Sequence, residues 1–118
     1  MIDCFILFFP EEELEVPAPP GLPTAVKVTD KSVTLSWPAS QSSDVTHYVV
    51  ELRNIEDGGN AWKVAMKNVK ETKCVIDDLK YGDEFFFRVL ACNDTVVSEA
   101  SPVSEKVLVE GKFKEKYV

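Results

Sequence analysis

Apolar and polar residues alternate along most of the chain after residue 23, the pattern of β-strands that bury one face. The alternating apolar positions, in chain order, are Val26 and Val28; Val33, Leu35 and Trp37; Tyr48, Val50 and Leu52; Trp62 and Val64; Cys74 and Ile76; Phe85, Phe87, Val89 and Ala91; and Val107 and Val109. No segment sustains the 3.6-residue period of an amphipathic helix. The pattern therefore predicts seven short strands.

The segments between these strands carry residues that favour turns. Examples are residues 57–60 (Asp-Gly-Gly-Asn), 77–78 (Asp-Asp) and 81–83 (Tyr-Gly-Asp). Seven short strands joined by such turns are typical of two packed antiparallel sheets. The predicted fold class is all-β: a seven-stranded, two-sheet, immunoglobulin-like sandwich.

Composition limits the kind of partner that this chain can have. The 118 residues are 45% hydrophobic and 28% charged, which is typical of one globular domain. The formal net charge of −7 argues against binding to nucleic acid, which requires a cationic surface, and nothing in the sequence favours membrane insertion. The partners expected are proteins.

Charge and proline content divide the chain into three parts. Residues 1–16 hold five acidic and no basic residues and form an acidic and apolar N-terminal flank. Pro17, Pro19, Pro20 and Pro23 then make a connector that neither a helix nor a central strand tolerates. We expect the domain to span residues 17–110. Residues 111–118 carry three lysines and one glutamate and read as a linker or the start of a further domain.

The N-terminal flank contains an apolar run that leaves two interpretations open. The run, Phe5, Ile6, Leu7, Phe8 and Phe9, is shorter than the roughly 20 residues that cross a bilayer, and no basic residue precedes it as in a signal peptide. It is either an extension without structure, including one added by cloning, or an association strand, because uncharged runs without proline pair with open sheet edges. Self-association through this flank is therefore one hypothesis.

Residues able to carry chemistry are few. One histidine and three cysteines show no metal-binding spacing and no catalytic arrangement, so we expect no enzyme activity, cofactor or metal site. Cys74 falls on an inward position and Cys92 on an outward one, and unpaired cysteines favour a reducing compartment. Asn93-Asp94-Thr95 is a glycosylation sequon, which matters only in a secreted protein.

The outward positions of the third and sixth predicted strands form a candidate protein-contact face. Its residues are Val49, Arg53, Phe86, Arg88 and Leu90. Exposed apolar patches mark interaction sites, and aromatic residues with arginine are enriched where binding energy concentrates. The alternative is ordinary cross-strand pairing on a solvent-facing sheet. The apolar run of residues 5–9 is a further candidate to occupy this face, from its own chain or from another copy.

Several motifs in this order resemble fibronectin type III domains, most closely those of intracellular muscle giants such as titin and twitchin. They are Ser-Val-Thr-Leu-Ser-Trp at 32–37, Tyr-Val-Val-Glu-Leu-Arg at 48–53, Trp62, the run from Leu79 to Asn93, and Ser101-Pro102. The resemblance covers about four fifths of the chain. The sequence departs from the family at Phe85, where a tyrosine is usual. It also departs in the loop at 94–98 after the sixth predicted strand, called the F–G loop in this family, which has Val96-Val97 where glycines are frequent.

The resemblance implies a non-enzymatic structural and protein-interaction module of a larger intracellular, multidomain muscle (sarcomeric) protein. Neighbouring domains of the same chain would then be among its partners, and its location would be the cytoplasm. Two alternatives stay open: an extracellular receptor or adhesion module, in which Asn93 carries sugar, and a regulatory segment that flanks a kinase domain.

Overall fold

The computed structural model describes residues 16–55 and 61–111. The predicted association strand, the turn at 57–60 and nearly all of the C-terminal linker lie outside these residues. The seven strands are β1 (Thr24–Val28), β2 (Val33–Ser36), β3 (His47–Asn54), β4 (Lys63–Val69), β5 (Lys73–Ile76), β6 (Glu84–Cys92) and β7 (Val107–Leu108). The all-β prediction and the seven predicted strands are confirmed.

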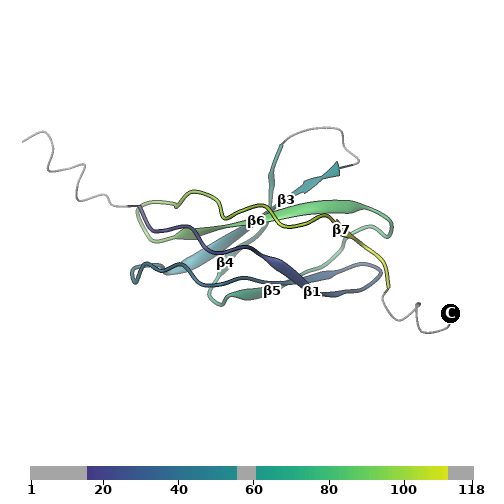
Figure 1. Ribbon diagram of the computed structural model, residues 1–118, viewed down its shortest axis with the longest axis horizontal. Coiled ribbons are helices and arrows are strands. Elements are labelled where there is room, and N and C mark those ends of the chain that lie inside the picture. The colour runs from purple at the N-terminus through teal and green to yellow at the C-terminus, as the bar shows by residue number, and fades with distance from the viewer. Residues whose placement is uncertain (1–15, 56–60, 112–118) are drawn as a thin grey trace, which may run out of the picture.

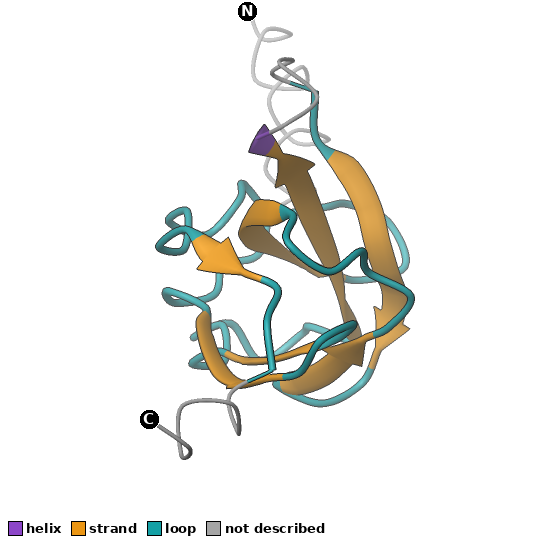
Figure 2. Cartoon of the chain, turned by 90° about the vertical axis from the view of Figure 1, so that its right-hand side faces the viewer, coloured by secondary structure: helices purple, strands orange, loops and turns teal. Residues whose placement is uncertain are grey.

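The strands form two antiparallel sheets that face each other as two layers (Figure 2). One sheet has the order β1-β2-β5 and the other has the order β4-β3-β6-β7. Figure 1 shows that the first described residues lie at one end of the long axis and the last at the other. The chain therefore enters and leaves the sandwich at opposite ends.

The core lies between the sheets and consists of the inward positions of the alternating pattern. Leu35, Val50, Phe87 and Val89 are fully buried. Trp37, just after β2, packs edge-on against Tyr48 with ring centroids 5.7 Å apart. Removing this apolar surface from water is the main driving force for the fold.

The first strand departs from the predicted alternation. Val26 was expected to point inward with Val28, but its side chain is 55% exposed, and Ala25 packs against the core in its place. The cause is a register shift against β2 between Ala25 and Lys27. One extra residue at a bulge sends the following side chain to the other face.

Backbone hydrogen bonds stabilise the turn between β5 and β6. The usual tyrosine, whose hydroxyl would bond to this turn, is replaced by Phe85 in β6. The N–H of Leu79 donates to the Lys31 carbonyl at 2.9 Å, and the N–H of Gly82 donates to the Val109 carbonyl at 2.9 Å. Gly82 has φ +93°, a backbone conformation that glycine adopts without strain. Phe85 itself is buried in the core.

Three serines at every third position attach the segment before β7 to β6. Each serine N–H donates to a β6 carbonyl, and each hydroxyl accepts the N–H of that same β6 residue. The pairs are Ser98 with Ala91 (both bonds 2.8 Å), Ser101 with Val89 (2.8 and 2.9 Å) and Ser104 with Phe87 (2.8 and 2.9 Å). We call this arrangement the serine ladder. It satisfies buried β6 amide groups where no regular strand pairs with them.

Candidate protein-contact face

The candidate site lies on the outer surface of β3 and β6, where three cross-strand pairs follow one another. From the His47 end of β3 they are Val49 opposite Leu90, Glu51 opposite Arg88, and Arg53 opposite Phe86. Each of these side chains is half-buried. The strand register thus brings the five predicted residues onto one face, together with Glu51.

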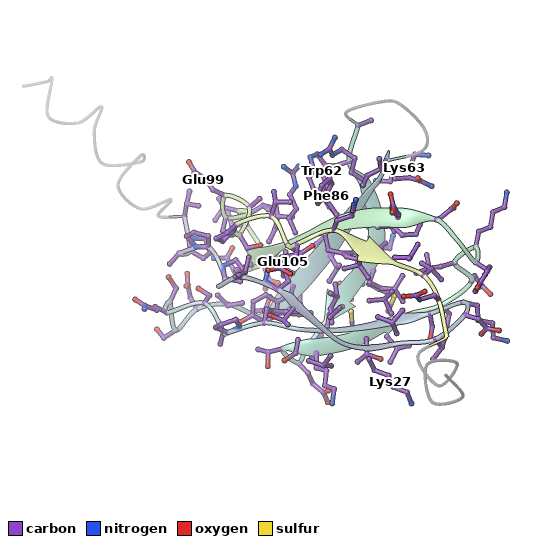
Figure 3. All side chains as sticks on the ribbon, turned by 45° about the vertical axis from the view of Figure 1, so that its right-hand side comes forward. Lys27, Trp62, Lys63, Phe86, Glu99 and Glu105 are labelled. Carbon is purple, nitrogen blue, oxygen red and sulfur yellow. The ribbon has the colours of Figure 1, made fainter. Side chains whose placement is uncertain are left out.

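Trp62, which directly precedes β4, completes this face. The Arg88 guanidinium lies 4.3 Å from the centroid of a Trp62 ring. The Arg53 guanidinium lies 5.6 Å from a Trp62 ring and 4.9 Å from the Phe86 ring. Figure 3 shows Trp62 and Phe86 beside each other on the outer side of the four-stranded sheet. Two cations are therefore held against two aromatic rings, an attractive arrangement.

We use the name arginine–aromatic face for Val49, Glu51, Arg53, Trp62, Phe86, Arg88 and Leu90. One carboxylate belongs to it: the Nε–H of Arg88 donates to Oε1 of Glu51 at 2.7 Å. The side chains of this pair are 29% and 18% exposed, so solvent screens the pair only in part. The stacking and the ion pair together fix the position of the Arg88 guanidinium.

The predicted apolar cluster of Val49, Phe86 and Leu90 is less exposed than the sequence suggested. All three side chains are half-buried, and the guanidinium of Arg53 lies over the Phe86 ring. The site prediction also omitted Trp62, which the sequence analysis used to mark the fourth strand and as a family motif. An aromatic residue at a strand start is the signal that could have placed Trp62 here. Contact of this face with a partner stays a prediction.

The model of the fibronectin type III domain family matches residues 18–107. The chain belongs to this family. It is 28% identical over 103 residues to titin of Drosophila melanogaster, a match covering 85% of this chain and 1% of titin. It is 37% identical over 106 residues to smooth muscle myosin light chain kinase of Gallus gallus, covering 86% of this chain and 5% of the kinase. Human Roundabout homolog 2 is 30% identical over 95 residues, covering 79% and 7%.

Solved structures agree with this assignment. A crystal structure of titin domains superimposes with a TM-score of 0.74 at 28% identity, over 81% of this chain and 33% of that one. The twitchin kinase region from Caenorhabditis elegans gives a TM-score of 0.72 at 32% identity, over 83% and 17%. The fibronectin type III domain described here thus spans a small part of the relatives that it matches.

Two cysteines of this fibronectin type III domain, Cys74 and Cys92, lie in the described part of the chain. Cys74 packs against the core as expected, and burial raises the pKa of its thiol to about 11. Cys92 was predicted to point outward, but it is 2% exposed. The chain folds back after β6, and the backbones of Cys92 and Val97 form an isolated antiparallel β-bridge. The F–G loop therefore shields the Cys92 side chain. Burial raises the pKa of the Cys92 thiol as well.

Asn93 of the sequon has a structural role in the F–G loop. Its Oδ1 accepts the N–H groups of Thr95 and Val96 at 2.8 and 2.9 Å. Its Nδ2 donates to Oδ2 of Asp44 at 3.0 Å and so connects the F–G loop to the loop before β3. Within residues 16–55 and 61–111, no three His, Cys, Asp or Glu side chains gather as a metal site would require.

A groove of about 360 Å³ lies between β1 and β7, the end strands of the two sheets. Leu22, Ala25 and Leu108 contribute apolar surface to it. Its charged lining residues are Glu105, Lys106 and Glu110, so the local charge is negative.

In the part of the chain that the structure describes, no helix has the length and apolar content that a bilayer crossing needs.

Proposed function

We propose that this fibronectin type III domain is a non-enzymatic structural and protein-interaction module of a larger intracellular muscle protein. The observation that carries the proposal is the arginine–aromatic face, where Arg53 and Arg88 stack on Trp62. Tryptophan and arginine dominate the energetics of protein interfaces. Because their side chains are already ordered, a partner that binds here loses less conformational entropy.

The second part of the proposal concerns spacing within a domain array. The described chain enters and leaves at opposite ends of the sandwich (Figure 1). Residues 17–110 would be the rigid unit, and residues 1–16 and 111–118 would connect it to neighbouring domains of the same chain. Similarity to titin and to smooth muscle myosin light chain kinase supports a muscle context, with the sarcomere as the expected location.

Localisation in muscle cells tests the proposal directly. The full chain, fused to a fluorescent protein and expressed in cultured cardiomyocytes, should give a striated pattern. Arg88→Glu should lose the pattern, because it reverses a charge on the arginine–aromatic face. Lys27→Glu, the matched reversal on the exposed surface of β1, should keep it. A diffuse distribution of the unaltered chain would contradict the muscle assignment.

An extracellular receptor or adhesion module is the first alternative, supported by the sequon and by the similarity to Roundabout homolog 2. Glycopeptide mass spectrometry of Asn93 from the native source decides between the compartments. Sugar on Asn93 would replace the intracellular proposal with the extracellular one.

A regulatory segment beside a kinase domain is the second alternative. It is supported by the similarity to the twitchin kinase region and to myosin light chain kinase. The test is the rate of peptide phosphorylation by the natural protein, with residues 5–9 all replaced by serine. A changed rate supports this role, and an unchanged rate excludes it for these residues.

A further inference from the structure

We propose that the domain packs side by side with a second copy of itself. The side of one sandwich formed by β4 and β5 would enter the groove between β1 and β7 of the other. This contact does not involve the arginine–aromatic face, so it extends the proposed function to lateral packing of sandwiches. It rests on opposite charges carried by two opposite sides of one molecule.

The four end strands of the two sheets form these two sides. β1 and β5 end the three-stranded sheet, and β4 and β7 end the four-stranded sheet. β1 and β7 line the groove together, whereas β4 and β5 lie beside each other on the other side. A contact between two different surfaces of identical molecules is heterologous, and it can add copies one after another in a row.

Three exposed lysines lie on the side formed by β4 and β5. Lys67 lies in β4, Lys70 in the connection that follows, and Lys73 at the start of β5. Among the described residues, none of the three forms an ion pair. Glu71 is the one acidic residue of the sequence from 63 to 75. We call Lys67, Lys70 and Lys73 the lysine border, a positive surface on a chain whose net charge is −7.

The groove between β1 and β7 has the opposite charge. Glu105 and Glu110 line it together with Lys106, and Glu105 is labelled in Figure 3. Nζ of Lys106 lies 3.9 Å from Oε2 of Glu84, so a carboxylate beside the groove partly offsets its charge. Neither Glu105 nor Glu110 forms an ion pair with another described residue. Two carboxylates are therefore available to lysines of a neighbouring molecule.

Apolar side chains accompany the charges on both surfaces. Leu22 and Leu108 line the groove and are 47% and 38% exposed. On the other side, Val64 of β4 and Val75 of β5 are 58% and 48% exposed. Covering apolar side chains that are exposed to this extent is favourable. The two surfaces therefore match in apolar content as well as in charge.

The contact would be made by side chains and not by an added strand. Pro23 directly precedes β1 and has no N–H to donate, and the bulge between Ala25 and Lys27 interrupts the edge of β1. β7 has two residues, and the pairing of β4 with β3 shifts register on both sides of Val50. Both sandwiches therefore stay folded as they are, and pairs of lysine and glutamate give the contact its specificity.

The contact should be weak between free chains, because exposed ion pairs contribute little individually. It becomes effective where sandwiches are held together, since short flexible linkers give effective concentrations on the order of millimolar. Salt should weaken it, because the Debye length falls from about 10 Å at 0.1 M to about 3 Å at 1 M ionic strength. Association that depends on both concentration and salt is therefore the first expected property.

Sedimentation velocity of the full chain at low salt, at concentrations up to about 1 mM, tests the contact. The average mass should rise with concentration above that of one chain and return to it in 1 M salt. The border variant, Lys70→Glu with Lys73→Glu, should associate on the order of tenfold more weakly, because attractive pairs become repulsive. Lys31→Glu with Lys80→Glu makes the same change in net charge at exposed lysines outside both surfaces and should associate normally.

Reversal of the groove separates a specific contact from an effect of net charge. The groove variant, Glu105→Lys with Glu110→Lys, has a net charge of −3 instead of −7. General repulsion between chains is thus lower, and an effect of net charge would increase association. The proposal predicts the opposite, a loss on the order of tenfold, because the lysine border then meets lysines.

A mixture of the border variant and the groove variant decides whether the two surfaces meet each other. Each variant alone should stay monomeric, because its two surfaces have the same sign. The mixture should associate again, since the acidic border of one variant fits the basic groove of the other. Circular dichroism checks folding, and a variant that fails to fold is replaced by the corresponding glutamine variant.

Several results would overturn the inference. They are a monomeric full chain at every concentration, association that neither reversal weakens, and a mixture that stays monomeric. Association that is lost when residues 5–9 become serine, or Lys112, Lys114 and Lys116 become glutamine, but survives reversal of the lysine border would assign the contact to a terminal segment instead. If this inference fails while Arg88→Glu still disrupts localisation, the proposed function stands.

Discussion

Replacing Ser101 by alanine tests how much the serine ladder contributes to stability. The Ser101 hydroxyl accepts the N–H of Val89 at 2.9 Å, and both residues are at least 95% buried. Alanine keeps the bond from the residue 101 N–H to the Val89 carbonyl, because that bond involves only backbone atoms. The substitution therefore removes one hydroxyl and leaves one buried N–H without its acceptor.

An unsatisfied buried donor costs about 1–3 kcal/mol, so we expect the free energy of unfolding to fall by about 2 kcal/mol. In a domain of this size, each kcal/mol shifts Tm by about 4–8 °C, which predicts a Tm lower by about 8–16 °C. The slope of unfolding free energy against urea should stay the same, because the surface exposed on unfolding does not change.

Urea unfolding, followed by tryptophan fluorescence to which buried Trp37 contributes, measures this change. The control is Ser43→Ala at an exposed serine, which should alter stability by less than about 0.5 kcal/mol. Hydrogen exchange adds a local readout, since the Val89 amide should exchange faster in Ser101→Ala. A loss no larger than that of Ser43→Ala would refute the role assigned to the ladder.

Three further predictions concern other parts of the sandwich. Burial raises the pKa of Cys74 from 9.0 to about 11, so stability should be constant below pH 9 and decline as pH rises toward 11; Cys74→Ala should remove that component in urea unfolding measured against pH. Trp62→Ala should cost about 1–2 kcal/mol, since two cation–π contacts of about 0.5–1 kcal/mol each are lost; an unchanged unfolding midpoint would argue against them. Gly21→Ala should lower Tm, because its new Cβ would lie 2.6 Å from Cγ of Pro38; Gly82→Ala meets no neighbour within 4 Å and should lose about 1–2 kcal/mol of stability, because a Cβ is disfavoured at its positive φ.

The strands could be predicted from the sequence because their side chains alternate between core and solvent. β6 is the clearest case: Phe85, Phe87, Val89 and Ala91 are all buried, as their spacing indicated. The incorrect prediction that Val26 points inward has a different origin. A bulge is a property of the pairing between β1 and β2, and the pattern of one strand contains no information about it.

The serine ladder could not be predicted from alternation, because its buried residues repeat every third position. Ser98, Ser101 and Ser104 are polar and flank a proline, so they resemble a surface loop. Their burial depends on hydrogen bonds to β6, a strand distant in sequence. A repeat of serines at this spacing is the signal that could have indicated them.

The candidate site was predicted in part. Period-two alternation placed Val49, Arg53, Phe86, Arg88 and Leu90 on one face, and the register agrees with that placement. Alternation alone does not show the stacking on Trp62, because the stacking depends on where β4 begins against β3. The burial of Cys92 was missed for a similar reason, since it depends on how the F–G loop folds back.

The serine ladder also protects one border of the four-stranded sheet against pairing with another strand. Each hydroxyl of the ladder also donates to the carbonyl of the next residue: Glu99, Pro102 and Glu105, at 2.7, 2.9 and 2.8 Å. Pro102 has no N–H to offer, so this border of the four-stranded sheet lacks the regular donors and acceptors that template another strand. In an array of similar sandwiches at high local concentration, such a border favours separate folding of each domain over exchange of strands between them.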